Sequence, residues 1–110
     1  MLENEKTQSK DNENKKTSSG DEVNEYLAKI QAIVYKHFIP PANSEGNSVK
    51  VVIELSTYGK LLDFRIIQDS SNQALNLECA KIKDRLRGVL FPMNPEGKSS
   101  RTVVNIISDK

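Results

Sequence analysis

The sequence predicts an α+β fold with the element order α-β-β-α-β, in which a three-stranded antiparallel sheet packs against two helices. Three observations carry this prediction. Residues 49–68 hold two runs rich in β-branched and aliphatic side chains around a short turn at Tyr58-Gly59, which is typical of a hairpin. An amphipathic helical segment precedes the hairpin and a second one follows it. A last β-forming run, residues 102–107, closes the chain.

The first helix is expected over about residues 22–37. Ser19 or Asp21 can cap it, and acidic side chains suit the positive end of a helix. Pro40-Pro41 end the helix and redirect the chain, because proline lacks an amide donor and restricts the residue before it. Apolar side chains recur at three- and four-residue spacing and form one wide stripe that can lie on a sheet: Val23, Tyr26, Leu27, Ile30, Ile33, Val34 and His37.

The hairpin strands alternate in the way that half-buried strands do. In the second strand, Leu62, Phe64 and Ile66 are expected on the core face. The first strand is apolar on nearly both faces in its middle, which favours a central position in the sheet. Its core-facing residues are expected to be Val49, Val51, Ile53 and Leu55.

The second helix is expected over about residues 73–87, after the turn and N-cap cluster of residues 69–72 and before Gly88 as a C-cap. In the last strand, Val104 and Ile106 share one face and Val103 and Ile107 share the other. This strand pairs most simply beside the first strand, so the expected order is 2-1-3 and the last strand is an edge. The core stripe of the second helix is expected to be Leu75, Cys79, Ile82 and Leu86.

The first part of the chain has the composition of a disordered linker. Up to residue 25 it carries seven acidic residues and four lysines, with only Leu2 and Val23 as large aliphatic side chains. Such a segment cannot bury enough apolar surface to offset its ordering entropy. We therefore expect a disordered polar linker over residues 1–21 and one folded domain over residues 22–110. The folded part is mildly basic, which is ordinary for a solvated surface.

No pattern in the sequence predicts catalysis, a metal site or a cofactor. The chain has no HExxH, CxxC, glycine-rich phosphate loop or G-x-S-x-G motif. His37 is the only histidine and is expected to cap or pack the end of the first helix. Cys79 is the only cysteine, so it forms no disulfide within the chain and is expected to be a buried, inert thiol. We therefore expect a non-enzymatic protein without a small-molecule substrate.

Basic residues on the second helix suggest an alternative hypothesis, nucleic-acid binding. Lys81, Lys83, Arg85 and Arg87 form two rows on either side of the core stripe. No exposed aromatic residue interleaves with them, and no GxxG loop or aromatic RNA-binding strand is present. We expect no nucleic-acid partner, and a small cytoplasmic nucleic-acid-binding module remains the alternative.

The edge of the last strand is the candidate binding site. An apolar edge with few charges is an aggregation hazard unless a partner chain uses it. A peptide can add beside such an edge through main-chain hydrogen bonds, or two copies of a monomer can pair through it. The candidate residues are Arg101, Thr102, Val103, Val104, Asn105, Ile106 and Ile107.

Four motifs in this order resemble the C-terminal domain of the TonB/TolA family of trans-envelope energy transducers. The opening helix with Phe38 and Pro40-Pro41 resembles the first motif, and the hairpin with glycine at its turn resembles the second. The start of the second helix at Asp69-Ser70-Ser71 resembles the third, and Phe91-Pro92-x-x-Pro95 resembles the fourth. Asn72 stands where the family often has glycine. The loop after Pro41 and the polar linker are closer to TolA-type chains, although the cysteine pair of some TolA domains is absent.

The resemblance implies a periplasmic domain of an inner-membrane-anchored bacterial protein, with the transmembrane segment and its motor partners lying outside this sequence. TolA-like members bind TolB, the lipoprotein Pal, colicins or phage coat proteins and serve the Tol-Pal system and outer-membrane integrity. TonB proper binds the box peptide of outer-membrane siderophore and vitamin transporters. We expect a TolA-like domain first and TonB proper as the alternative. In both, the resemblance implies binding by strand addition.

Overall fold

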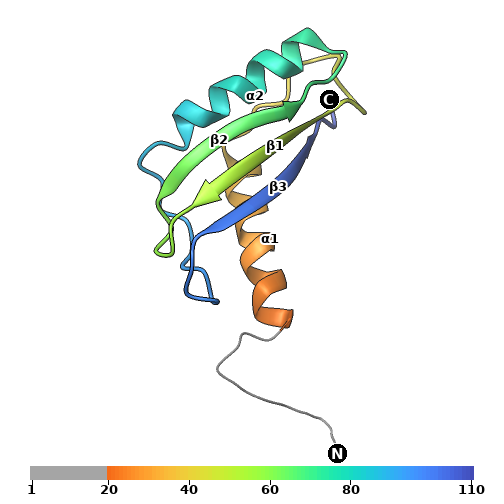
Figure 1. The fold of residues 1–110 in the computed structure, drawn as a ribbon. Helices are drawn as coiled ribbons and strands as arrows, with labels where there is room; N and C mark the ends of the chain where they lie inside the picture. Colours follow the sequence, from red (N-terminus) through yellow and green to blue (C-terminus); the bar gives the residue numbers. More distant parts are fainter. Residues whose placement is uncertain (1–19) are drawn as a thin grey trace, which may run out of the picture.

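The computed structural model describes residues 20–110, and the expectation for the linker up to residue 19 lies outside this range. The chain forms two helices and a three-stranded antiparallel sheet, which confirms the predicted α+β fold and its element order (Figure 1). The elements are α1 (Gly20–Lys36), β1 (Ser48–Leu55), β2 (Leu61–Gln68), α2 (Gln73–Arg85) and β3 (Ser100–Ile107).

The sheet has the order β2-β1-β3, as the sequence predicts. β1 is central and pairs with both neighbours, for example through Val51 with Ile66 on one side and Val104 on the other. The β1–β3 register runs without interruption from Ser48–Ile107 to Leu55–Ser100. β3 is therefore a regular strand at one edge of the sheet.

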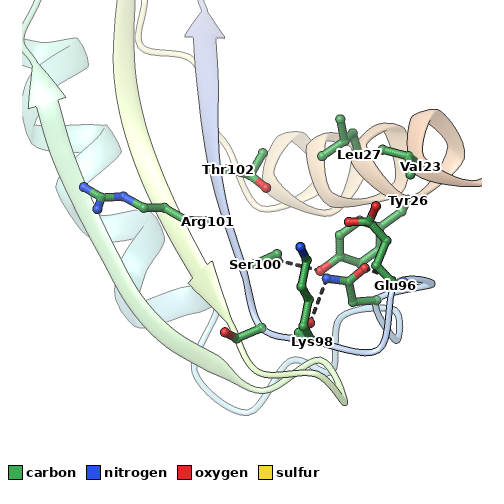
Figure 2. Close-up of a pocket in the computed structure, with 10 residues that line it drawn as sticks. Val23, Tyr26, Leu27, Glu96, Lys98, Ser100, Arg101 and Thr102 are labelled. Atoms are coloured by element: carbon green, nitrogen blue, oxygen red, sulfur yellow. Dashed lines mark hydrogen bonds between the residues drawn. The ribbon is translucent and has the colours of Figure 1, made fainter. Parts of the chain in front are cut away.

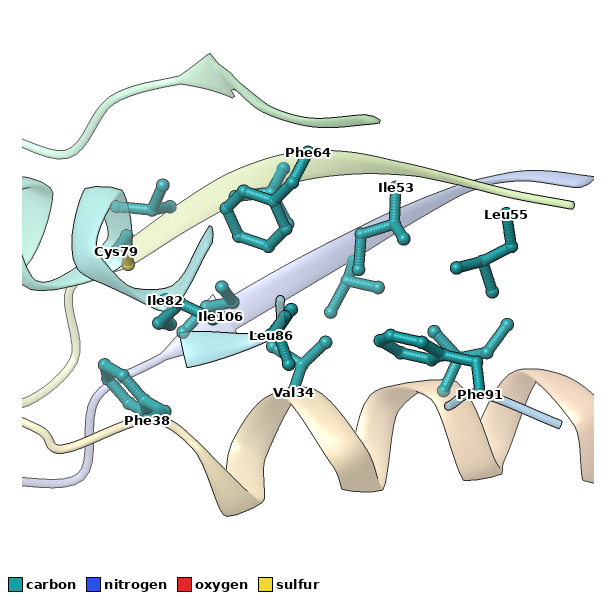
Figure 3. Close-up of a cluster of buried hydrophobic side chains, with 14 of the residues drawn as sticks. Val34, Phe38, Ile53, Leu55, Phe64, Cys79, Ile82, Leu86, Phe91 and Ile106 are labelled. Carbon is teal, nitrogen blue, oxygen red and sulfur yellow. The ribbon is translucent and has the colours of Figure 1, made fainter. Parts of the chain in front are cut away.

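The core lies between one face of the sheet and both helices (Figures 1 and 3). The β1 side chains Val49, Val51, Ile53 and Leu55 are fully buried, as predicted. The stripe predicted for α2 is also fully buried. Figure 3 shows Val34 of α1, Phe38 just after the end of α1, and Phe91 closing the cluster from the side opposite the sheet. Residues that contribute from the helices and loops are Tyr26, Ile30, Val34, Phe38, Leu75, Cys79, Ile82, Leu86 and Phe91.

Two local details differ from the expectations. α1 begins at Gly20, so Asp21 lies inside its first turn and does not cap it, while the other cap candidate, Ser19, lies outside the described residues. Leu62 is 56% exposed although its alternation with Phe64 predicted a core position. The β1–β2 register shifts between Glu54 and Leu55, so that Leu61 pairs with Leu55 and packs against the core in place of Leu62.

Asn72, the last residue of the predicted cap cluster, caps α2: its side-chain oxygen accepts a hydrogen bond from the Leu75 amide at 2.9 Å. The helix ends at Arg85, two residues earlier than expected, with Leu86 as its C-cap. Gly88 follows with a positive φ of 79°, a conformation that favours glycine.

Glu78 and Arg85 tie α2 to the end of α1. The two side chains form a bidentate ion pair, the Ile39 amide donates to Glu78 Oε2 at 2.8 Å, and Arg85 donates to the His37 carbonyl at 2.9 Å. Burial alone would raise the pKa of the Glu78 carboxyl, but the hydrogen bonds from Arg85 and the Ile39 amide, with the positive charges of Arg85 and Lys81, hold that pKa below its usual range. The charged pair thus stabilises the junction between the helices.

The segment after α2 pairs with the turn of the hairpin. The Phe91 amide donates to the Gly59 carbonyl at 2.9 Å, and the Asn94 amide donates to the Thr57 carbonyl at 3.0 Å. Gly59 is buried with a positive φ of 95°. A Cβ atom at this position would lie 2.0 Å from the Phe91 carbonyl oxygen, so only glycine fits between these two backbones.

Candidate peptide-docking edge

A tyrosine of α1 reveals which way the main chain of β3 points. The Tyr35 hydroxyl donates to the Asn105 carbonyl at 3.0 Å and accepts from the Ile107 amide at 2.9 Å. In an antiparallel sheet the amide and carbonyl of one residue point to the same side of the strand, and the side alternates along the chain. The residues whose main chain points away from β1 are therefore Arg101, Val103, Asn105 and Ile107.

The other three candidate residues hold β3 in place. Thr102, Val104 and Ile106 pair their main chains with β1, opposite Ile53, Val51 and Val49. Val104 and Ile106 also bury their side chains in the core. The candidate site thus divides into residues that anchor the strand and residues that present an edge.

The edge is open over its first half and closed over its second half. Tyr35 occupies the Asn105 carbonyl and the Ile107 amide, whereas no described residue bonds to the outward groups of Arg101 or Val103. The Val103 side chain is 58% exposed on the face of the sheet opposite the helices. The open half of β3 offers unpaired main-chain donors and acceptors, which is what strand addition requires.

A hollow of about 350 Å³ lies beside this open half, between α1 and the start of β3. Figure 2 shows Val23 and Leu27 of α1 facing Thr102 of β3, while the Tyr26 hydroxyl meets Ser100 Oγ at 2.7 Å at the base. The hollow is on the helix side of the sheet edge. A side chain from a strand added to β3 opposite Thr102 would point into it.

Charged side chains lie around the open half of the β3 edge. Glu96 and Lys98 line the hollow, and neither side chain forms an ion pair with another residue in the part of the chain that the structure describes. Arg101 points away from the hollow, across the sheet (Figure 2), and its Nε lies 3.8 Å from Glu54 Oε2. Glu54 also lies 3.6 Å from Arg65 Nη2. A partner strand would therefore meet charges of both signs at the rim.

The basic residues on α2 and in the turn after it do not form one free patch. Arg85 is engaged by Glu78 and the His37 carbonyl, and Arg87 lies 3.3 Å from Asp84. Cys79 is fully buried, and burial raises the pKa of its thiol to about 11, with the nearby charge of Glu78 adding to the effect. Within residues 20–110, no three histidine, cysteine or acidic side chains gather in a way that could hold a metal ion.

The sequence predicts the edge strand but not its surroundings. Tyr35 and the hollow were not predicted, because they depend on where α1 crosses β3. The only signal was that Tyr35 lies outside the predicted apolar stripe and still carries an aromatic ring. Neither α1 nor α2 is long and apolar enough to cross a membrane, and no other helix is present in the described range.

The fold, an exposed β3 edge and the glycine-tipped hairpin are the features expected from the resemblance, and comparison with known families agrees. The sequence profile of the family described as TonB C terminal matches residues 23–106. The chain belongs to the TonB C-terminal family. It is therefore a TonB/TolA-like domain of an envelope energy transducer, and such domains are periplasmic protein-interaction domains. Among curated proteins, the sequence finds no match.

Proposed function

We propose that this TonB C-terminal domain binds a short peptide strand of an envelope protein by strand addition at the open half of β3, residues 101–105. One observation carries the proposal: the main chains of Arg101 and Val103 point outward and bond to no described residue, in a family whose members work through protein contacts. Outward groups at the edge of an antiparallel sheet are a template for another strand.

Selectivity comes from the hollow beside the edge. Alternate side chains of an added strand point to opposite faces, so every second one lies on the helix side. The side chain opposite Thr102 meets Val23 and Leu27, which favours an apolar residue at that position. The paired length is short, so the affinity is weak, on the order of micromolar, as suits a transient link in the envelope.

A TolA-like role is our first proposal for the partner. The polar linker and the loop after Pro41 support it, and the partner is then a TolB-like or Pal-like envelope protein of the Tol-Pal system. The alternative is TonB proper, with the box peptide of an outer-membrane transporter as partner. In either role the domain acts from an inner-membrane anchor and its motor proteins, without a substrate of its own.

Titration of the isotope-labelled domain tests the proposal. One arm uses the N-terminal peptide of a TolB-like protein and the other a transporter box peptide. Amide shifts concentrated in residues 101–105, with smaller ones in Val23 and Leu27, are the expected result. Shifts confined to residues 81–87, or shifts produced only by RNA, would contradict strand addition and favour the nucleic-acid reading.

Two neighbouring proline substitutions supply a matched control. Val103→Pro removes an outward amide, so the domain stays folded and loses the peptide. Val104→Pro removes an amide that pairs with Val51 of β1, so it destabilises the domain. If Val103→Pro binds the peptide as well as the wild type does, the peptide does not pair with this edge.

A further inference from the structure

The second half of the β3 edge is closed by a single side chain. The Tyr35 hydroxyl bridges the Asn105 carbonyl and the Ile107 amide, which are consecutive outward groups of the strand. The Tyr35 ring packs edge-on against Phe38, with ring centroids 6.0 Å apart and an interplanar angle of 77°. Phe38 is a core residue, so the ring, and with it the hydroxyl, is held against the edge.

We propose that Tyr35 is an edge guard: its hydroxyl restricts strand addition to residues 101–105 and disfavours the full-length pairing of β3 with β3 of a second copy of this chain. The first part of this inference rests on the proposed function, whereas the second part does not. Natural proteins protect exposed strands with charges, prolines and bulges. β3 has no proline, pairs with β1 in unbroken register and carries one charge, Arg101, near its start, so protection of its second half falls to a side chain from α1.

The hydrogen-bond pattern between two paired β3 edges explains why one hydroxyl is sufficient. The longest antiparallel pairing of two β3 edges places Arg101 opposite Ile107 of the other copy and Val103 opposite Asn105. Each pair must exchange an amide and a carbonyl in both directions. Tyr35 already occupies the Ile107 amide and the Asn105 carbonyl, so it removes one bond from every pair. A shorter added strand that ends before the Asn105 carbonyl and the Ile107 amide loses almost none of its hydrogen bonds to β3.

The test is Tyr35→Phe in the complete chain, because this variant keeps the ring and removes only the hydroxyl. Two readouts are measured without any partner peptide: the exchange rate of the Ile107 amide proton and the self-association of the domain by sedimentation. We expect faster exchange at Ile107 under monomeric conditions at high dilution. We also expect self-association to strengthen roughly tenfold or more, as restoring net main-chain hydrogen bonds between two edges would give.

Tyr26→Phe is the matched control on the same helix. Its hydroxyl meets the side chain of Ser100 and no outward main-chain group of β3, so its removal should leave self-association unchanged. Adding Asn105→Pro to Tyr35→Phe should abolish the gained association, because the pairing needs the Asn105 amide.

Three results would overturn the inference. Unchanged Ile107 exchange in Tyr35→Phe would mean that the hydroxyl does not hold the amide. Faster exchange without stronger self-association would mean that the Tyr35 hydroxyl holds the Ile107 amide but does not limit pairing between two copies. Equal association in Tyr26→Phe and Tyr35→Phe would point to general loosening of α1. None of these outcomes depends on whether a peptide binds at residues 101–105, so a failed peptide titration and a failed guard remain distinguishable.

Discussion

Gly59 offers the sharpest test of the packing between the hairpin and the segment after α2. In Gly59→Ala, the new methyl group would lie 2.0 Å from the Phe91 carbonyl oxygen and 2.8 Å from its carbon. These are backbone atoms, so they cannot rotate aside as a side chain would. The residue also has a φ of 95°, which costs an L-amino acid about 1–2 kcal/mol.

The steric term adds to the conformational one. Forcing an extra methyl group into a closely packed site costs typically about 1–3 kcal/mol, so Gly59→Ala should lower the free energy of unfolding by about 2–5 kcal/mol in total. Gly88→Ala is the control: its φ of 79° carries the same conformational cost, but nothing lies within 4 Å of the added Cβ. That variant should lose only about 1–2 kcal/mol.

The assay is equilibrium unfolding in guanidinium chloride, followed by far-UV circular dichroism for the two variants and the wild type. If Gly59→Ala and Gly88→Ala lose the same free energy within about 0.5 kcal/mol, the ordinary scatter between independent sites, the close approach of Gly59 and Phe91 contributes nothing. The main chain at Phe91 can shift away from the new methyl group, but this shift breaks the hydrogen bond from the Phe91 amide to the Gly59 carbonyl. A clear difference in unfolding free energy between the two variants would therefore remain.

Two further predictions concern buried ionisable groups. The Cys79 thiol, whose pKa is raised to about 11, should react slowly with a thiol reagent in the folded domain and quickly in denaturant; equal rates would remove it from the core. The pKa of Glu78 is lowered in the folded state, so its stabilisation is present above the ordinary carboxyl range and is lost as the pH falls through the lowered folded pKa. Glu78→Gln should cost about 1–3 kcal/mol at neutral pH and flatten the acid side of the stability curve; an unchanged curve would show that the pair with Arg85 does not drive it.

Local patterns predicted most of the fold because the elements carry strong periodicity. The burial of β1 and the α2 stripe followed from alternation and three- and four-residue spacing, and the N-cap followed from Asn72. Leu62 was misplaced because a register shift is set by pairing with β1, which strict alternation does not encode.

The candidate site was predicted only in part, for a related reason. The strand and its edge position followed from element order, since a hairpin leaves one side of β1 for β3. The guard at Tyr35 and the hollow near Thr102 join residues about seventy positions apart. Their geometry depends on the crossing of α1 over β3, and no local spacing in either segment determines it.

The last element of the chain completes contacts begun by the first. The hydroxyl contacts from α1 to β3 join residues 74 positions apart at Tyr26 and 72 positions apart at Tyr35. β1 likewise pairs with a strand that lies some fifty residues later in the sequence. Such distant contacts cost loop-closure entropy before they stabilise the fold, which is expected to slow folding. Before β3 pairs with it, the apolar strand β1 is itself an open edge of the sheet. A chain truncated before residue 100 would therefore leave β1 as the open edge, in the position that β3 occupies in the whole domain.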